Sequence, residues 1–282
     1  MKPLVYACAI GLISVGCQNK TEPEQTDLTS YPANLSSKMS VVSVLPAAIA
    51  KYQQMINAGK DLNQYNEKGN TIVVQAIEEN LIPAVKLLIQ AGVDLNRESA
   101  NGITPLMAVI NNANKSIPKI LNNGSVIHIE LEKTVNESLM TQLIHAGAAV
   151  NHANQFQQTP LMVAASLGNT DAVKLLIEQS CDLNMRDLNG MSALAFAVAQ
   201  GHIDIVKQLL KSEADANLCD TQGQSPLMHA AEAGNLDMVK LLVNADANVN
   251  MRDAYDISPL KTARLGGHSD VAKFLVKHGA KE

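Results

Sequence analysis

The chain has 282 residues, of which 46% are apolar and 17% are charged, and its formal net charge is −5. That length allows one large domain or two small ones, and the apolar fraction is too high for general disorder. The weak acidic balance, without a block of Lys and Arg, argues against nucleic acid or anionic lipid as the main ligand.

Residues 1–16 are typical of an export signal. The sequence MKPLVYACAIGLISVGC has one Lys near its start, then a short apolar run, and then small residues before Cys17. An apolar run of this length cannot cross a hydrocarbon core of about 30 Å as a stable helix, so it predicts a cleaved signal peptide and not a membrane anchor. A plain secretory signal is one interpretation.

The ending SVGC resembles the lipobox of bacterial lipoproteins, with Ser14 where that family usually has Leu. The resemblance implies that cleavage leaves Cys17 as the first residue, carrying lipid on its sulfur and its amine. Gln18, in place of Asp, resembles the pattern that directs such proteins to the periplasmic face of the outer membrane, with the inner membrane as the alternative. Residues 17–44 are polar and contain Pro, Ser and Thr, which predicts a flexible tether behind the lipid-anchored Cys.

The rest of the chain repeats itself. Copies of TPLM or a close relative begin at Thr104, Thr159, Ser192, Ser225 and Ser258. The last four copies follow one another at a constant period of 33, and a recurring Asn keeps the same period except for one interval of 55. That Asn stands at Asn63, Asn96, Asn151, Asn184, Asn217 and Asn250. One copy therefore contains an insertion, whose length is the difference between these two intervals.

The pattern TPL…AA…GN…AVKLLI…A…LN at this period is similar to the ankyrin repeat over residues 45–282. The resemblance implies an all-α solenoid of about seven helix-turn-helix units, each with an apolar side that only its neighbours can cover. It also implies a concave face made by the turns and the first helices. The expected units are 45–68, 69–101, 102–157, 158–190, 191–223, 224–256 and 257–282. The first is expected to be a worn amino-terminal cap, and the last a polar carboxy-terminal one.

Local signals fit this assignment. Thr159 predicts a helix cap, Pro160 the first helical residue, and Gly168 a helix end with positive φ. The sequence departs from the family in two ways. Met162 and its equivalents stand where the family often has His, and Gly is absent from EQSCDLN, KSEADAN and VNADANVN, where second helices should end.

The insertion falls in the third unit, within about 111–135. It could lengthen both helices of that unit and add a loop around 122–124, while SVIHIELE alternates in a strand-like way. Insertions on one side of a solenoid often contribute to binding, but a surface loop without a binding role is equally compatible with the sequence.

The sequence contains no catalytic or phosphate-binding motif and no metal-ligand spacing, so we expect no enzyme activity and no cofactor. His202 and His268 stand at a structural position of the ankyrin repeat, and His229 lies on a first helix. The separation of Cys181 and Cys219 exceeds the period by five, which favours two free thiols over a disulfide. The recurring carboxylates are Asp187, Asp220 and Asp253. Their period indicates turn chemistry and not acid–base catalysis.

Ankyrin proteins usually bind partners with turn tips and with the exposed side of their first helices. The equivalent positions carry residue types that are enriched in protein interfaces. They are Tyr65, Phe156, Gln158, Arg186, Leu188, Met191, Gln222, Glu232, Arg252, Tyr255 and Ile257. The alternative for Leu188, Met191 and Ile257 is that they merely cover neighbouring turns.

The sequence therefore predicts a non-catalytic protein of the bacterial envelope that binds one folded protein and is monomeric when free. The more specific hypothesis, which rests on resemblance to ankyrin-type immunity lipoproteins, is an immunity protein that blocks a toxin acting in the periplasm, such as a secreted phospholipase. The alternative is an envelope scaffold or stress-protection factor that binds an endogenous protein. Contact with the membrane is expected through the lipid alone.

Overall fold

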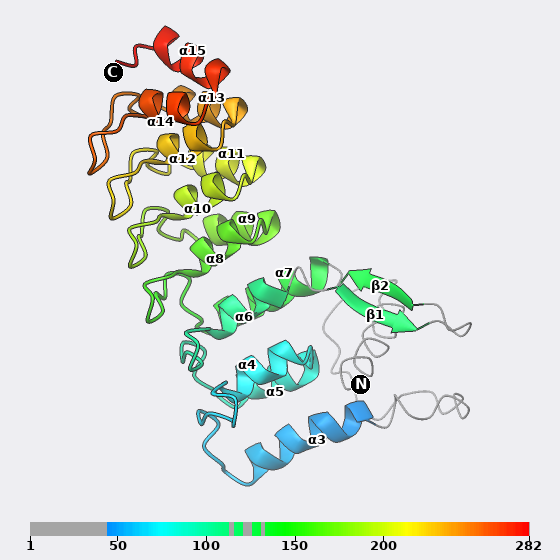
Figure 1. The fold of residues 1–282 in the computed structure, drawn as a ribbon. Helices are drawn as coiled ribbons and strands as arrows, with labels where there is room; N and C mark the ends of the chain where they lie inside the picture. Colours follow the sequence, from blue (N-terminus) through cyan, green and yellow to red (C-terminus); the bar gives the residue numbers. More distant parts are fainter. Residues whose placement is uncertain (1–43, 113–115, 121–125, 131–132, 282) are drawn as a thin grey trace.

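The computed structural model describes residues 44–112, 116–120, 126–130 and 133–281 (Figure 1). In these residues the chain forms thirteen helices and one β-hairpin, arranged as a curved stack. The first helices of the units are α4 (Ile72–Glu78), α6 (Pro105–Asn112), α8 (Pro160–Ser166), α10 (Ala193–Ala199), α12 (Pro226–Glu232) and α14 (Pro259–Leu265). The second helices are α5 (Ile82–Gln90), α7 (Lys133–His145), α9 (Thr170–Glu178), α11 (Ile203–Lys211), α13 (Leu236–Asn244) and α15 (Ser269–Lys277). The predicted signal peptide, Cys17 and nearly all of the predicted tether lie outside the described residues.

The all-α ankyrin fold is confirmed, but the first unit differs from its prediction. From residue 44 onward, this unit contains a single helix, α3 (Val44–Asn57), which packs against the second helix α5. Six helix pairs follow it, as many as the units predicted after the first, so the described residues contain six complete helix-turn-helix units and one single helix. Tyr52 on α3 is only 2% exposed, so the single helix covers the apolar side of the first pair as a cap would.

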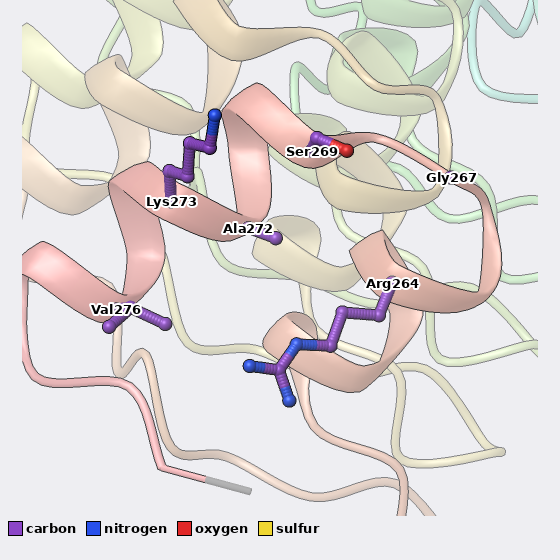
Figure 2. A pocket seen from close by; sticks show the side chains of 6 residues that line it. All are labelled: Arg264, Gly267, Ser269, Ala272, Lys273 and Val276. Carbon is purple, nitrogen blue, oxygen red and sulfur yellow. The ribbon is translucent and has the colours of Figure 1, made fainter.

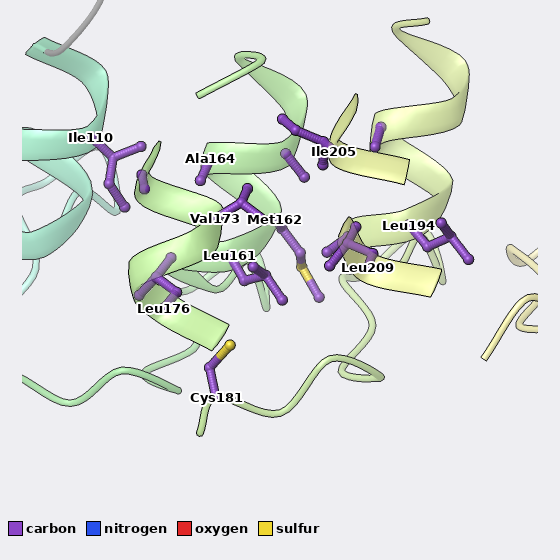
Figure 3. Close-up of a cluster of buried hydrophobic side chains, with 14 of the residues drawn as sticks. Ile110, Leu161, Met162, Ala164, Val173, Leu176, Cys181, Leu194, Ile205 and Leu209 are labelled. Carbon is purple, nitrogen blue, oxygen red and sulfur yellow. The ribbon is translucent and has the colours of Figure 1, made fainter. Parts of the chain in front are cut away.

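The core runs through the whole stack, because first helices pack on first helices and second helices on second helices. Figure 3 shows the middle of this core, where Leu161, Val173 and Leu176 of one unit lie near Leu194 and Leu209 of the next. Small residues such as Ala164 let the first helices approach closely. The apolar side chains form a continuous layer between units and not one central cluster. Each helix pair therefore needs its neighbours to bury its apolar side.

The predicted helix boundaries are confirmed. Thr159 Oγ1 accepts a hydrogen bond from the backbone N–H of Met162 at 3.3 Å, and Pro160 is the first residue of α8. Gly168 ends the first helix at φ 73°, and a Cβ there would lie 2.7 Å from the ring of His202. His202 Nε2 lies 3.2 Å from the carbonyl oxygen of Ser166, so this His joins neighbouring units, as predicted.

The second helices that lack Gly end in the same conformation as the others. Ser180, Glu213 and Asp246 adopt φ of 56°, 66° and 59° where Gly92 and Gly279 stand in other units. A side chain in this left-handed region costs about 1–2 kcal/mol relative to the right-handed region. The stack therefore imposes the turn even where the local sequence opposes it.

The turn role of the recurring carboxylates is also confirmed. Asp187 Oδ1 accepts from the backbone N–H of Asn189 and of Met191 at 2.9 Å each, and Asp220 and Asp253 make the equivalent pairs. These bonds close the turn that leads into each first helix.

The recurring Asn has a different role, since it joins successive units. Asn184 Oδ1 accepts from the backbone N–H of Asp215 at 2.9 Å, and the same bond recurs at the other joints of regular length. An equivalent bond spans the insertion, with Asn96 Oδ1 accepting from Ala149 N–H at 2.7 Å. The insertion therefore leaves the stacking of the units on either side of it unchanged at this point.

The insertion contains an antiparallel hairpin of β1 (Ser116–Ile120) and β2 (Val126–Glu130). The strand predicted from SVIHIELE is therefore present. The helix α7 has 13 residues against nine in the other second helices, whereas α6 has only eight, so the expected lengthening occurs mainly in the second helix. The predicted loop at 122–124 lies outside the described residues. In Figure 1 the hairpin extends from the end of the helices opposite to the turn tips.

The last unit exposes a polar flank. Lys261 and Arg264 are exposed on α14, where the preceding first helix has the buried Met228 and Ala231. Figure 2 shows an open hollow at this flank, with Arg264, Lys273 and Val276 around it. The charges are those expected of the predicted carboxy-terminal cap.

Among the described residues, no helix combines the length and the apolar character needed to span a membrane.

Candidate protein-binding surface

The candidate surface, called the first-helix face below, consists of the turn tips and the exposed stripe of each first helix. On α8 the stripe is formed by Val163, Ser166 and Leu167, whose spacing of three and four residues places them on one side of the helix. Residues between them, such as Ala164 and Ala165, are fully buried. The same side faces solvent on the other first helices except α6, where Asn111 alone is partly exposed and the remaining residues are buried.

Four predicted tip residues are large, apolar and exposed. Tyr65, Phe156, Leu188 and Tyr255 are exposed by 50%, 47%, 62% and 73%. The alternative role of Leu188, covering a neighbouring turn, does not fit so large an exposed fraction. Tyr65 is partly occupied, because the guanidinium of Arg97 lies 4.7 Å above its ring in a cation–π contact.

The tips are joined into a row by backbone hydrogen bonds. Leu188 N–H donates to the carbonyl oxygen of Phe156 at 3.2 Å, which places these two apolar side chains in adjacent tips. The same bond links Thr221 to Asn189 at 2.8 Å further along the row. A partner would therefore meet a row whose spacing is fixed by the backbone.

Two predicted binding residues, Arg186 and Arg252, brace the turns. Arg186 donates to the carbonyl oxygens of Gly190 at 3.0 Å and Cys219 at 2.6 Å, the second in the next turn along the stack. Arg252 donates to the carbonyl oxygen of Asp256 and pairs with its carboxylate, both at 3.1 Å. Both Arg side chains are exposed, but the structure already engages their guanidinium groups.

The other predicted residues divide into two groups. Gln222 and Glu232 are exposed on the first-helix face, whereas Gln158, Met191 and Ile257 are half-buried beside the turns. The half-buried group partly supports neighbouring turns, which was the alternative interpretation for Met191 and Ile257. All eleven predicted positions lie on turn tips or first helices, along a face too long for one small contact.

The prediction missed Leu167 and Phe196, two apolar residues of the stripe. Leu167 is 41% exposed after α8, and Phe196 is half-buried on α10. Their spacing was a partial signal, because both stand four or eight residues after the capping Thr159 or Ser192, as Val163 and Gln200 do on the same two stripes.

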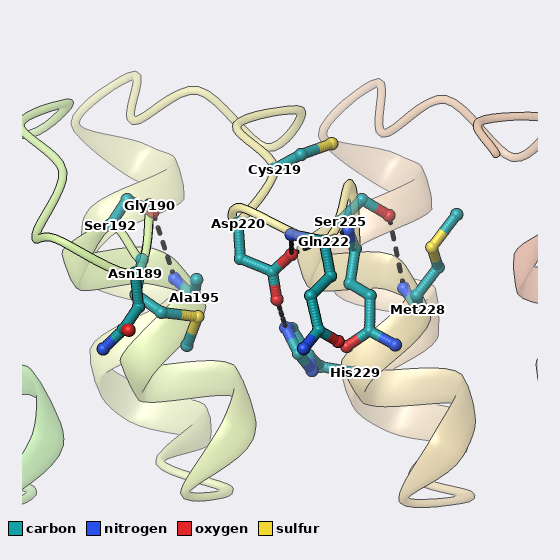
Figure 4. Close-up of polar contacts among 12 residues, drawn as sticks. Asn189, Gly190, Ser192, Ala195, Cys219, Asp220, Gln222, Ser225, Met228 and His229 are labelled. Atoms are coloured by element: carbon teal, nitrogen blue, oxygen red, sulfur yellow. Dashed lines mark hydrogen bonds and ion pairs between the residues drawn. The ribbon is translucent and has the colours of Figure 1, made fainter. Parts of the chain in front are cut away.

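A polar contact lies under the turn that leads into α12 (Figure 4). His229 Nε2 is 3.5 Å from Asp220 Oδ2, and the two side chains are exposed by 16% and 11%. At that distance the contact is an ion pair only when the imidazole is protonated, and Nε2 has no hydrogen-bond partner otherwise. Asp220 also accepts the backbone hydrogen bonds that close its own turn, so its contact with His229 supports the turn tip. The imidazole of His229 lies next to the first-helix face.

The two described cysteines are free thiols with poor nucleophilic character. Burial raises the pKa of Cys181 to about 11. Burial also raises the pKa of Cys219, and the carboxylate of Asp220 adds to that shift. Because the thiolate is the reactive form, both thiols are weak nucleophiles at neutral pH. In the part of the chain that the structure describes, no three His, Cys, Asp or Glu side chains are grouped to hold a metal ion.

Comparison with known proteins agrees with this architecture. A sequence model of the family "Ankyrin repeats (3 copies)" matches residues 47–131, 127–220 and 207–282. The chain is 29% identical to the ankyrin repeat protein FPV031 of fowlpox virus over 140 residues, which are 44% of the chain and 41% of that protein. It is 25% identical over 128 residues to the human transient receptor potential cation channel subfamily A member 1, covering 41% of the chain and 11% of the channel.

Among solved structures, the ankyrin repeat domain of Bcl-3, described as a unique member of the IkappaB protein family, superposes with a TM-score of 0.62. It has 28% identity and covers 76% of this chain and 89% of the Bcl-3 chain. The chain spans less than half the length of the two relatives named above. Ankyrin repeat domains are typically non-catalytic scaffolds that bind proteins. With the repeat, its geometry and these matches in agreement, the chain belongs to the ankyrin-repeat family.

Proposed function

We propose that this protein is a non-catalytic binder that grips one folded protein with its first-helix face. The observation that supports the proposal is the row of tips, in which Phe156, Leu188 and Tyr255 expose large apolar side chains that the core leaves uncovered. Aromatic side chains such as Phe156 and Tyr255 are enriched in protein interfaces, and an exposed apolar Leu188 beside them enlarges the apolar surface that a partner can cover.

We place the binder in the bacterial envelope, anchored by lipid on Cys17. The support is the sequence of residues 1–17, with its short apolar run and the SVGC ending. Substitution tests this placement. Incorporation of labelled palmitate should be lost in Cys17→Ala and kept in Cys8→Ala, because Cys8 would leave with the signal peptide. Label retained by Cys17→Ala would contradict the anchor without touching the binding surface.

The specific activity we propose is immunity: the protein occupies a toxin that acts in the periplasm, such as a secreted phospholipase, and blocks it. A binder needs no chemistry of its own for this task, because covering the catalytic cleft of the toxin excludes its substrate. The support is the combination of an export signal with an ankyrin array, together with the resemblance to immunity lipoproteins.

The test is deletion of the gene in cells that encode a neighbouring toxin candidate. We expect deletion to poison the cells or their siblings, and expect rescue by the wild-type gene but not by a gene encoding Phe156→Ala with Leu188→Ala. Survival without any defect would contradict immunity. Recovery of a housekeeping protein from unpoisoned cells, in place of a toxin, would indicate a scaffold.

A further inference from the structure

Charged residues are distributed unevenly between the two faces in the middle of the stack. The first helices α8 and α10 read PLMVAAS and ALAFAVA and carry no charge. The second helices α9 and α11 read TDAVKLLIE and IDIVKQLLK and carry three charged residues each. Several of these pair within their own helix, as in Lys207 with Asp204 at 3.2 Å. The charges of these two units therefore lie mainly on the second-helix side.

The neutral part of the first-helix face is continuous, and it is called the neutral patch below. On the helices it consists of Val163, Ser166, Leu167, Phe196, Ala199 and Gln200. The exposed side chains of Phe156 and Leu188 continue it onto two bonded tips. Two charged side chains stand beside these tips and both are engaged: Arg186 donates to two turn carbonyl oxygens, and the Glu98 carboxylate accepts from Gln155 N–H and lies 3.0 Å from His152 Nε2.

Charges return on both sides of the neutral patch along the stack. The equivalent stripe carries Glu78 and Glu79 at the end of α4, and Glu232 at the end of α12. On α14, Lys261 and Arg264 are exposed beside the stripe. The first helix α6 (PLMAVINN) is uncharged as well, so the lack of charge is a property of α6, α8 and α10 and not of all first helices.

We infer that the neutral patch docks an uncharged, predominantly apolar segment of the partner protein, an inference that rests on the proposed function of this face. Burying apolar surface of both proteins against each other removes that surface from water, which favours the complex. Burying a charged partner group against the neutral patch would remove its hydration without offering an opposite charge. The flanking charges on α4, α12 and α14 then meet the rim of the partner, where they set orientation more than affinity.

The first consequence is insensitivity of binding to salt. Screening weakens interactions between exposed charges but leaves apolar burial in place. We therefore expect the Kd for the partner to change less than about threefold between 50 mM and 1 M NaCl, because screening acts on the charged rim only. A partner held by complementary charges would instead lose affinity steeply over that range.

The second consequence concerns one added charge. Ala199→Glu places a carboxylate in the neutral patch, at an exposed position at the end of α10. We expect it to weaken binding at least tenfold, because the carboxylate must be desolvated in the complex. Ala91→Glu is the matched control, since Ala91 is exposed after the second helix α5, outside the first-helix face.

The experiment uses the full chain with p-benzoyl-phenylalanine in place of Gln200 or, as control, in place of Lys174 on α9. The protein cross-linked from an extract of the producing cells is identified and purified, and its Kd is measured for the wild type and both Glu variants at the two salt concentrations. Cross-linking from position 200 alone, an unchanged Kd in 1 M NaCl and a specific loss in Ala199→Glu support the inference.

Two other results overturn it in distinguishable ways. If the partner cross-links at position 200 but its non-covalent complex dissociates in 1 M NaCl, or if it binds Ala199→Glu as tightly as wild type, the segment docked on the neutral patch is not an uncharged apolar one. The inference then fails while protein binding by the first-helix face still stands. If cross-linking occurs from position 174 alone, or from neither position, the proposed use of the first-helix face fails and the inference fails with it.

Discussion

The tips of the four carboxy-terminal units (158–281) and the two tips that the insertion separates (97–103 and 152–158) belong to one repeat but are joined differently. Among the carboxy-terminal tips the joint is a backbone bond, such as Thr221 N–H to the carbonyl oxygen of Asn189 at 2.8 Å. A backbone bond makes no demand on the side chain. The side chains of these tips can therefore contact a partner, as the exposed Leu188 and Tyr255 illustrate.

The joint between the tips at 97–103 and 152–158, which the insertion separates in the sequence, depends on side chains instead. Gln155 N–H donates to Glu98 Oε2 at 3.0 Å, and Glu98 Oε1 lies 3.0 Å from His152 Nε2. Asn154 Nδ2 donates to the carbonyl oxygen of Gly102 at 2.8 Å. Because a solenoid's stability is a sum of unit and interface terms, the comparison identifies this interface as the place where the stack should divide.

The largest expected effect comes from core cavities on either side of this joint. Leu88 on α5 and Leu209 on α11 occupy equivalent positions and are both 0% exposed. Changing either to Ala should lower the free energy of unfolding by about 3 kcal/mol, from lost burial and the cavity left behind. Hydrogen exchange should show the loss of protection confined to 44–112 for Leu88→Ala and to 158–281 for Leu209→Ala. Loss across the whole chain in both variants would show that the joint is no boundary.

The joint itself can be broken at Glu98. Its carboxylate receives a backbone N–H and faces an imidazole, and its side chain is 25% exposed. Glu98→Ala should lower stability by about 1.5 kcal/mol, the typical value for a hydrogen bond to a charged group. Denaturant unfolding should then separate into two transitions. Glu67→Ala, at an exposed tip position, is the control and should leave a single transition unchanged.

Much of the repeat was predictable because its signals are local. The cap of Thr159 and the turn carboxylate of Asp187 act within four residues of themselves, so the sequence alone reveals them. The role of Arg186 was not predictable in this way, since one of its acceptors, the carbonyl oxygen of Cys219, belongs to the next turn of the stack. The position of Arg186 predicted a contact with a partner protein. The structure shows in addition a hydrogen bond to the next turn, which forms only when the units stack.

The exposed stripe shows a second limit. Phe196 follows the helical period of buried residues closely enough to be assigned to the core, and its half-buried position depends on how far α10 is rotated toward its neighbours. The unpaired helix α3 of the first unit could not be predicted for the same reason, because it too depends on packing. An apolar helical pattern predicts a helix, but whether the helix has a partner is decided by packing.

The ends of the second helices that lack Gly offer a substitution that should stabilise the stack. Glu213 adopts φ 66° at the end of α11, a conformation that Gly reaches without steric cost. Glu213→Gly should therefore raise the free energy of unfolding by about 1 kcal/mol, the cost of the left-handed conformation reduced by the greater freedom of Gly when unfolded. Ser180→Gly should act alike in its own unit. Lys211→Gly, inside α11, should instead destabilise, and equal effects from both changes would contradict the conformational explanation.

The change with the smallest effect at neutral pH concerns Cys181, which stands where four other units have Ala and one has Val93. The four Ala equivalents are Ala148, Ala214, Ala247 and Ala280. Burial raises the thiol pKa from 9.0 to about 11, so the folded state holds the proton longer than the unfolded state does. The contribution of the thiol to stability is complete below pH 9 and is lost as the pH rises toward 11. The difference in unfolding free energy between wild type and Cys181→Ala should therefore shift against the wild type over that range. A difference independent of pH would mean that the thiol stays accessible to water, and that the seam between these units is looser than the rest of the core.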